Sequence, residues 1–232
     1  MGQPLSSEPS SFARLRKPSL FFLAFYLAWT LRVVLLLPYE DRFESEVAHR
    51  VFLDAIRLLL WLAPLWVYLI RVDRAAPLTS LRLDVLPAPR RAVEAFVIAG
   101  TYFAVVATIA ITLEDKQTIF QRHVPLARWP WVLMGMWLAP IVEEIFFRGF
   151  VFRKLRDVLR FRPANLFSAL LFASIHVPGW LYLQGFGAGF ILSLVSVFII
   201  GYVLGLLVER TNSLWPAIVM HFLNNLLWSG GP

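Results

Sequence analysis

Seven apolar stretches divide this chain, and each approaches the length that a helix needs to cross a membrane. A spanning helix takes about 20 mostly apolar residues. Hydrophobic residues make up 59% of the 232 residues, and the mean hydropathy of +0.67 is too high for an ordinary soluble domain. We therefore predict an integral membrane protein that folds as an all-α bundle. The predicted spans are residues 19–37, 47–70, 92–112, 129–152, 163–177, 187–208 and 214–228.

The basic residues between these stretches fall mainly on one side of the predicted bundle. With the N-terminus in the cytoplasm, fourteen Lys and Arg residues lie on inner segments and four lie on outer segments. Because cytoplasmic loops carry an excess of positive charge, this asymmetry predicts an N-in, C-out orientation. It also accounts for the net charge of +7 without a nucleic-acid partner. Cysteine is absent, which excludes disulfides and thiolate metal ligands.

The chain divides into three predicted parts. Residues 1–18 form a polar cytoplasmic tail without the cleavage pattern of a signal peptide. Residues 19–112 form the front helices, which include a proline-containing cytoplasmic linker at about 71–91. Residues 129–228 form a back bundle, in which Gly201 and Gly205 predict a close contact between helices.

Charged residues interrupt the fourth apolar stretch. Glu143, Glu144 and Arg148 stand in a run that is otherwise apolar. An ionised group at membrane depth costs at least ~2.5–3.5 kcal/mol on insertion scales, so such groups persist where they are paired or functional. Glu144 and Arg148 are four residues apart and are expected to pair. Arg148 is alternatively a ligand for a substrate carboxylate. Glu143 points to another side of the helix, which makes it the candidate for chemistry.

Three further polar residues lie deep in the later stretches. His176 stands in the fifth stretch, and His221 and Asn225 share one face of the seventh. At a rise of 1.5 Å per residue, Glu143 lies about 13 Å, His176 about 18–20 Å and His221 about 10–15 Å from the cytoplasmic ends of their helices. These similar depths predict that the four residues converge on one site.

Two chemical schemes suit this set of residues. In the first, Glu143 and His176 activate a water molecule as general base, and His221 and Asn225 donate hydrogen bonds to an oxyanion. In the second, Glu143, His176 and His221 bind a divalent metal such as zinc, which carries the water. Both schemes predict hydrolysis of an amide bond.

The motifs Glu143-Glu144-x-x-x-Arg148, Phe172-x-x-x-His176 and His221-x-x-x-Asn225 resemble those of the CAAX protease and bacteriocin-processing (Abi) family. This family of intramembrane endopeptidases includes the type II CAAX prenyl endopeptidases. The resemblance implies a membrane bundle with a cavity open to the cytosol. It also implies that the first glutamate and the second-motif histidine activate water, and that the third-motif histidine and asparagine form the oxyanion hole. Both metal-dependent and metal-independent mechanisms have been described for the family.

These observations together predict an intramembrane endopeptidase of a bacterial plasma membrane. Its expected partners are membrane lipid and a peptide or protein substrate, which in this family can be lipidated. The alternatives are a non-catalytic scaffold or sensor, a bacteriocin-immunity protein, and a proton or ion transporter. Retention of costly polar residues disfavours the scaffold. The absence of an internal repeat and of paired broken helices disfavours the transporter.

Overall fold

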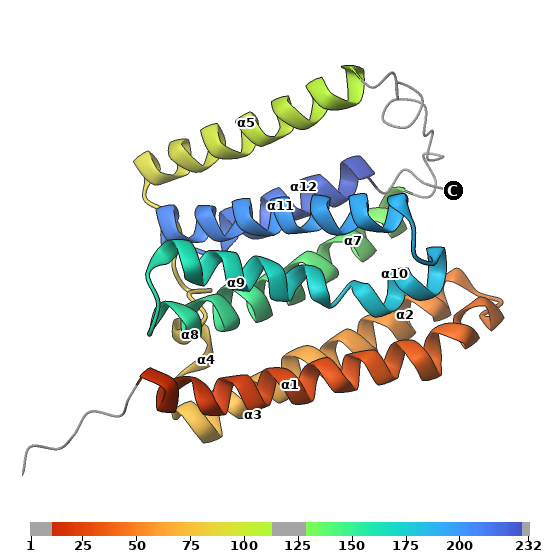
Figure 1. Ribbon diagram of the computed structural model, residues 1–232, viewed down its shortest axis with the longest axis horizontal. Helices are drawn as coiled ribbons and strands as arrows, with labels where there is room; N and C mark the ends of the chain where they lie inside the picture. Colours follow the sequence, from red (N-terminus) through yellow and green to blue (C-terminus); the bar gives the residue numbers. More distant parts are fainter. Residues whose placement is uncertain (1–10, 113–128, 229–232) are drawn as a thin grey trace, which may run out of the picture.

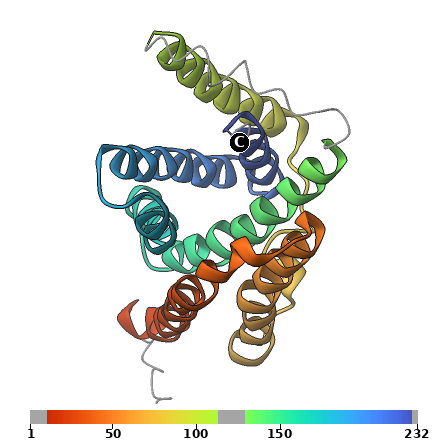
Figure 2. The same cartoon turned by 90° about the vertical axis from the view of Figure 1, so that its right-hand side faces the viewer.

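The computed structural model describes residues 11–112 and 129–228, and all regular elements within these ranges are helical. Figure 1 shows the long helices side by side, with their axes roughly parallel. Helices α1 and α2–α3 lie on one side of the bundle and α5 lies on the other, with α7, α9, α11 and α12 between them (Figures 1 and 2). The elements are α1 (Ser11–Leu36), η1 (Leu37–Arg42), α2 (Glu46–Arg57), η2 (Leu58–Leu62), α3 (Ala63–Tyr68), η3 (Leu69–Asp73), α4 (Pro77–Ser80), α5 (Pro89–Thr112), α7 (Trp129–Glu144), η5 (Ile145–Phe152), α8 (Arg153–Arg156), α9 (Phe161–Ser174), α10 (Val177–Gln184), α11 (Ala188–Thr211) and α12 (Trp215–Trp228).

Five helical segments in the described part of the chain are long and apolar enough to cross a membrane: Ala13–Glu40, Val47–Asp73, Pro89–Ile109, Phe161–Gln184 and Ala188–Thr211. The prediction of an all-α membrane protein is therefore confirmed. The other two predicted spans are helical but fall outside these five. Helix α12 has 14 residues, and the segment from α7 into η5 contains Glu143, Glu144 and Arg148. Seven spans and the N-in, C-out orientation stay predictions.

Two of the predicted helices differ from simple α-helices in ways that matter for the site. Helix α7 continues into the π-helical segment η5, a rare geometry that is frequent at functional sites. The predicted span 163–177 ends as an α-helix at Ser174, and the chain starts again as α10 with Pro178 in its first turn. Because Pro178 has no backbone N–H, it cannot donate to the carbonyl of Ser174 four residues earlier, so α9 cannot continue. His176 lies at this break.

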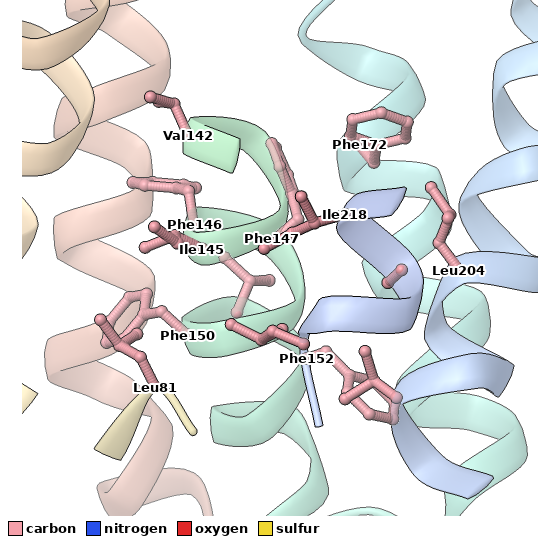
Figure 3. Packing of buried hydrophobic residues seen from close by; sticks show 14 of the residues in the cluster. Leu81, Val142, Ile145, Phe146, Phe147, Phe150, Phe152, Phe172, Leu204 and Ile218 are labelled. Carbon is pink, nitrogen blue, oxygen red and sulfur yellow. The ribbon is translucent and has the colours of Figure 1, made fainter. Parts of the chain in front are cut away.

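The core of the bundle is aromatic and surrounds η5, whose eight residues are all buried. Phe146 contacts Phe25 of α1 and Trp61 of η2, with ring centroids 4.1 and 5.5 Å apart. Phe147 contacts Phe172 of α9 at 5.2 Å. Figure 3 shows Phe146 and Phe150 on the side of η5 that faces α1, and Phe147 on the side toward Phe172. The segment that follows the two glutamates is therefore fixed by packing on all sides.

Helices α9 and α11 approach each other closely at two glycines, as the G-x-x-x-G spacing predicts. A Cβ on Gly201 would lie 3.0 Å from Phe172 Cδ1 and 3.2 Å from a terminal guanidinium nitrogen of Arg148. A Cβ on Gly205 would overlap Asn165 Oδ1 and lie 2.8 Å from its Cγ. The absence of a side chain at these two positions thus brings α11 onto α9 and admits Arg148 between the helices.

Replacing Gly205 by Ala is expected to destabilise the bundle by about 1–3 kcal/mol, the usual cost of overpacking. The clash falls on Asn165, which is buried and donates a hydrogen bond of 2.9 Å to the carbonyl of Tyr202, so its amide cannot move without losing that bond. Thermal unfolding in detergent measures the change. Gly100→Ala is the matched control, since a Cβ there meets nothing within 4 Å. Equal unfolding temperatures for the two variants would contradict the prediction.

Candidate active site

A buried ion pair joins the end of α7 to η5. Arg148 Nη1 lies 2.9 Å from Glu144 Oε1, and both side chains are completely buried. The pairing expected from the i, i+4 spacing is therefore confirmed. Arg148 also donates through Nη2 to the carbonyl of Gly201 at 2.8 Å, and its guanidinium carbon lies 4.3 Å from the ring centre of Phe172. Arg148 thereby ties α7 and η5 to both α9 and α11.

His221 of α12 reaches both glutamates. Its Nδ1 lies 2.8 Å from Glu144 Oε1, and its Nε2 lies 3.8 Å from Glu143 Oε2. Since Glu144 is paired with Arg148 as a carboxylate, it can only accept a hydrogen bond, so the Nδ1 of His221 carries a proton. This arrangement turns Nε2 of His221 toward Glu143. The sequence did not predict the hydrogen bond between Glu144 and His221, because these residues are 77 positions apart and lie on different helices.

The side chains of the two glutamates differ in their exposed fraction. The side chain of Glu144 is 0% exposed, whereas that of Glu143 is 15% exposed. Glu144 has a guanidinium and an imidazole as partners, whereas Glu143 has only Nε2 of His221 among the hydrogen bonds and ion pairs of the described residues. Glu143 is therefore the carboxylate that water or a substrate can reach.

His176 lies at the break between α9 and α10. Its Nδ1 is 3.0 Å from the carbonyl oxygen of Phe172, which can only accept, so this nitrogen carries the proton and Nε2 is left as an acceptor. The Phe172 ring makes edge contacts with His176 and His221, with centroids 5.2 and 5.8 Å apart. Phe172 therefore contacts both histidines.

Asn225 follows His221 by one turn on α12 and is half-buried. The neighbouring Asn224 accepts a hydrogen bond of 3.0 Å from the hydroxyl of Tyr102, which orients α12 against α5. The structure therefore brings Glu143, Glu144, Arg148 and His221 into one group, places His176 beside it across Phe172, and carries Asn225 on the same helix face as His221.

Helix α1 holds the break that contains His176. The hydroxyl of Tyr26 donates to the carbonyl of Ser174 at 3.2 Å, and Trp29 Nε1 donates to the carbonyl of Ile175 at 3.1 Å. The first of these carbonyls is the one that Pro178 leaves without a helical donor. Sequence reasoning missed Tyr26 and Trp29, because nothing in their local pattern indicates a partner about 146 residues away.

The same side chains were also predicted as metal ligands. In residues 11–112 and 129–228, no three His, Asp or Glu side chains lie together in a way that could hold a metal ion. As the side chains lie here, Glu143, His176 and His221 do not form a metal-ligand set.

Comparison with known families gives an independent identification. Residues 125–227 match the family model described as type II CAAX prenyl endopeptidase Rce1-like. No curated protein and no solved structure is detectably similar to the chain. The matched segment contains Glu143, Glu144, Arg148, His176, His221 and Asn225. Over residues 125–227 the chain is therefore similar to the type II CAAX prenyl endopeptidases, the family that its motifs resemble.

Proposed function

We propose that this membrane protein is an intramembrane endopeptidase that hydrolyses a peptide bond in a membrane-associated peptide or protein. The similarity of residues 125–227 to a protease family supports a protease in general. The observation that carries the specific proposal is Glu143, a partly exposed carboxylate that faces Nε2 of His221 beside a fully buried ion pair. A buried scaffold has no need of an accessible carboxylate at this position, because unpaired charge within a membrane is costly.

In the proposed reaction, water binds between the carboxylate of Glu143 and Nε2 of His176. Glu143 takes a proton from the water as its oxygen attacks the carbonyl carbon of the scissile bond. The resulting oxyanion accepts hydrogen bonds from Nε2 of His221 and the side-chain amide of Asn225. The tetrahedral intermediate then collapses, the C–N bond breaks, and Glu143 returns the proton to the leaving amine. The products are a new carboxylate and a new amine.

His221 can donate to the oxyanion only when both of its ring nitrogens are protonated, because Nδ1–H already donates to Glu144. The proposed oxyanion contact therefore uses the doubly protonated form of His221, which lies beside both carboxylates. Glu144 is proposed as a positioning residue that acts through His221, while Arg148 pairs with the carboxylate of Glu144. In this reaction Nε2 of His176 accepts a hydrogen bond from the attacking water, whereas Nε2 of His221 donates one to the oxyanion.

The proposed substrate is a peptide whose scissile bond lies near its C-terminus or near the membrane surface. An attached lipid is compatible with this proposal but is not required by the proposed reaction. The site lies among apolar helices, so a substrate segment that partitions into the bilayer is concentrated at the level of Glu143. The metal-independent scheme is the one proposed, since the described side chains provide no set of three metal ligands.

The test is cleavage in proteoliposomes of membrane-tethered peptides, with and without a prenyl group, in water enriched in ¹⁸O. Hydrolysis predicts product peptides whose new C-terminal carboxylate contains one ¹⁸O atom, detected by mass spectrometry. The same assay after exhaustive chelation separates the two mechanisms, because loss of cleavage on chelation and recovery with added metal would contradict the metal-independent scheme. Intact peptides in every reaction would favour the non-catalytic scaffold.

If His176 must be held at the helix break, then Tyr26→Phe and Trp29→Phe should each lower kcat by about threefold to tenfold, the effect of one neutral hydrogen bond. KM should change little, because neither side chain is proposed to touch the substrate. Trp215→Phe is the matched control, since it removes an N–H donor bond of 3.1 Å to Leu83 away from the histidines. Steady-state kinetics of peptide cleavage check this. An equal fall in kcat for Trp215→Phe would contradict the prediction, because it would mean that kcat responds to the loss of any such hydrogen bond and not to the position of His176.

A further inference from the structure

A groove of about 610 Å³ lies at one end of the bundle, on the part of α1 that precedes the Tyr26 and Trp29 contacts. It is bounded by the start of α1 and the end of η3, which lie at the same end of the molecule (Figure 1). This volume is within the usual range of small-molecule sites, about 300–1,000 Å³. The lining residues are Lys17, Leu20, Phe21, Tyr68, Arg71, Val72 and Arg74.

Three exposed cations stand around this groove: Lys17, Arg71 and Arg74. Within the described residues none of the three has an ion-pair partner. The carboxylate of Asp73, next to Arg74, lies 2.8 Å from Lys154 Nζ and is therefore already neutralised. Arg74 has a left-handed backbone with φ of 53°, which ends η3 and turns the chain at the rim. The groove thus has a concentrated positive rim.

The wall of the groove is apolar and exposed. Leu20 is 58% exposed and Val72 is 39% exposed, and they lie within Ala13–Glu40 and Val47–Asp73, two of the helical segments long and apolar enough to cross a membrane. Phe21 packs on Tyr68 with ring centroids 4.7 Å apart, which closes the floor of the groove. A positive rim above an apolar wall at the end of two spanning helices complements a molecule with an anionic head and a hydrocarbon tail.

We propose that this groove binds one anionic phospholipid, with its phosphate at Lys17, Arg71 and Arg74 and an acyl chain along Leu20, Phe21 and Val72. The predicted orientation places the rim at the cytoplasmic leaflet, where anionic lipids attract basic residues and where basic pockets between spanning helices bind their head groups. Each Lys or Arg near such a surface contributes to attraction, so three converging side chains give a preference for an anionic over a zwitterionic head group. This site is separate from the proposed active site and does not depend on catalysis.

The test measures bound lipid on the full chain by native mass spectrometry in mild detergent, with phosphatidylglycerol and phosphatidylcholine of identical acyl chains as probes. The wild type should retain one phosphatidylglycerol in preference to phosphatidylcholine. The variant Lys17→Gln/Arg71→Gln/Arg74→Gln should bind phosphatidylglycerol at least about tenfold more weakly. All three residues are exposed, so an unchanged thermal unfolding temperature is expected to show that the variant is folded.

The matched control is Arg90→Gln/Arg160→Gln/Arg162→Gln, which removes the same charge from exposed residues outside the groove. Retained phosphatidylglycerol in this control supports the groove, whereas an equal loss would mean that overall surface charge attracts the lipid. Leu20→Ser should weaken binding of long-chain but not of dihexanoyl phosphatidylglycerol. Displacement of the lipid by inorganic phosphate at similar concentration would overturn the proposal in favour of a free-anion site, and so would a wild type without head-group preference.

Discussion

Peptide cleavage should fall by about 10²–10⁴-fold in the Glu143→Gln variant, the contribution typical of a general base. A glutamine has nearly the same shape as a glutamate but cannot take a proton from water. Glu143 is 15% exposed, and its ion-pair partner Nε2 of His221 lies 3.8 Å away, so the variant should remain folded. Single-turnover and steady-state rates with the same membrane-tethered peptide measure the loss, and thermal unfolding confirms the folded state.

Glu209→Gln provides the control for the charge change. Glu209 is an exposed residue of α11 that pairs with Arg156, with Arg156 Nη2 and Glu209 Oε1 3.0 Å apart. Exposed ion pairs contribute only about 0–1 kcal/mol, so this variant should cleave at the wild-type rate. A Glu143→Gln enzyme as active as Glu209→Gln would remove Glu143 from the mechanism and with it the proposed reaction.

Among the variants proposed here, Arg148→Met should lower the free energy of unfolding the most. Arg148→Met leaves the carboxylate of Glu144 fully buried without its guanidinium partner and leaves the carbonyl of Gly201 without its donor. Breaking a buried pair in this way costs about 3–5 kcal/mol in the free energy of unfolding. Thermal or denaturant unfolding in detergent, followed by tryptophan fluorescence, should show the loss together with low yields of monodisperse protein.

Arg91→Met is the comparison for an exposed pair, because Arg91 Nη1 and Glu94 Oε2 are 2.7 Å apart and the Arg91 side chain is 52% exposed. Arg91→Met should lower the free energy of unfolding by at most about 1 kcal/mol.

Combining Arg148→Met with Glu144→Gln should recover part of the free energy of unfolding that Arg148→Met loses, since no uncompensated charge remains buried. Recovery should not restore cleavage, because the carboxylate that holds His221 is then gone. Equal stability of Arg148→Met and Arg91→Met would refute the role given to the buried pair.

Local spacing predicted those parts of the structure that depend on one helix at a time. The apolar stretches located the helices, the i, i+4 spacing paired Glu144 with Arg148, and the two glycines indicated the approach of α11 to α9. Depth along each helix predicted that Glu143, His176 and His221 would converge, because helices in a bundle share one axis direction. In the structure His221 Nε2 lies 3.8 Å from Glu143, and His176 and His221 both contact Phe172. Such features follow from periodicity, which the sequence displays directly.

Contacts between distant helices were not predictable in the same way. Whether His221 turns Nδ1 or Nε2 toward Glu143 depends on the rotation of α12 against α7, which no pattern in either helix specifies. The hydrogen bond from His221 to Glu144 therefore emerged only from the structure. The break at His176 has a local cause in Pro178, yet its consequence, the open carbonyl that Tyr26 fills, needed the position of α1.

The contacts of α1 also bear on how this protein can be divided. The family model covers residues 125–227, but two donors that fix the position of His176 and much of the aromatic packing around Phe146 come from residues outside that range. A fragment comprising only the matched segment would expose those rings and release the helix break. The segment that matches the family model is thus not expected to fold on its own. Any chimera that exchanges the front helices also changes the contacts that position His176.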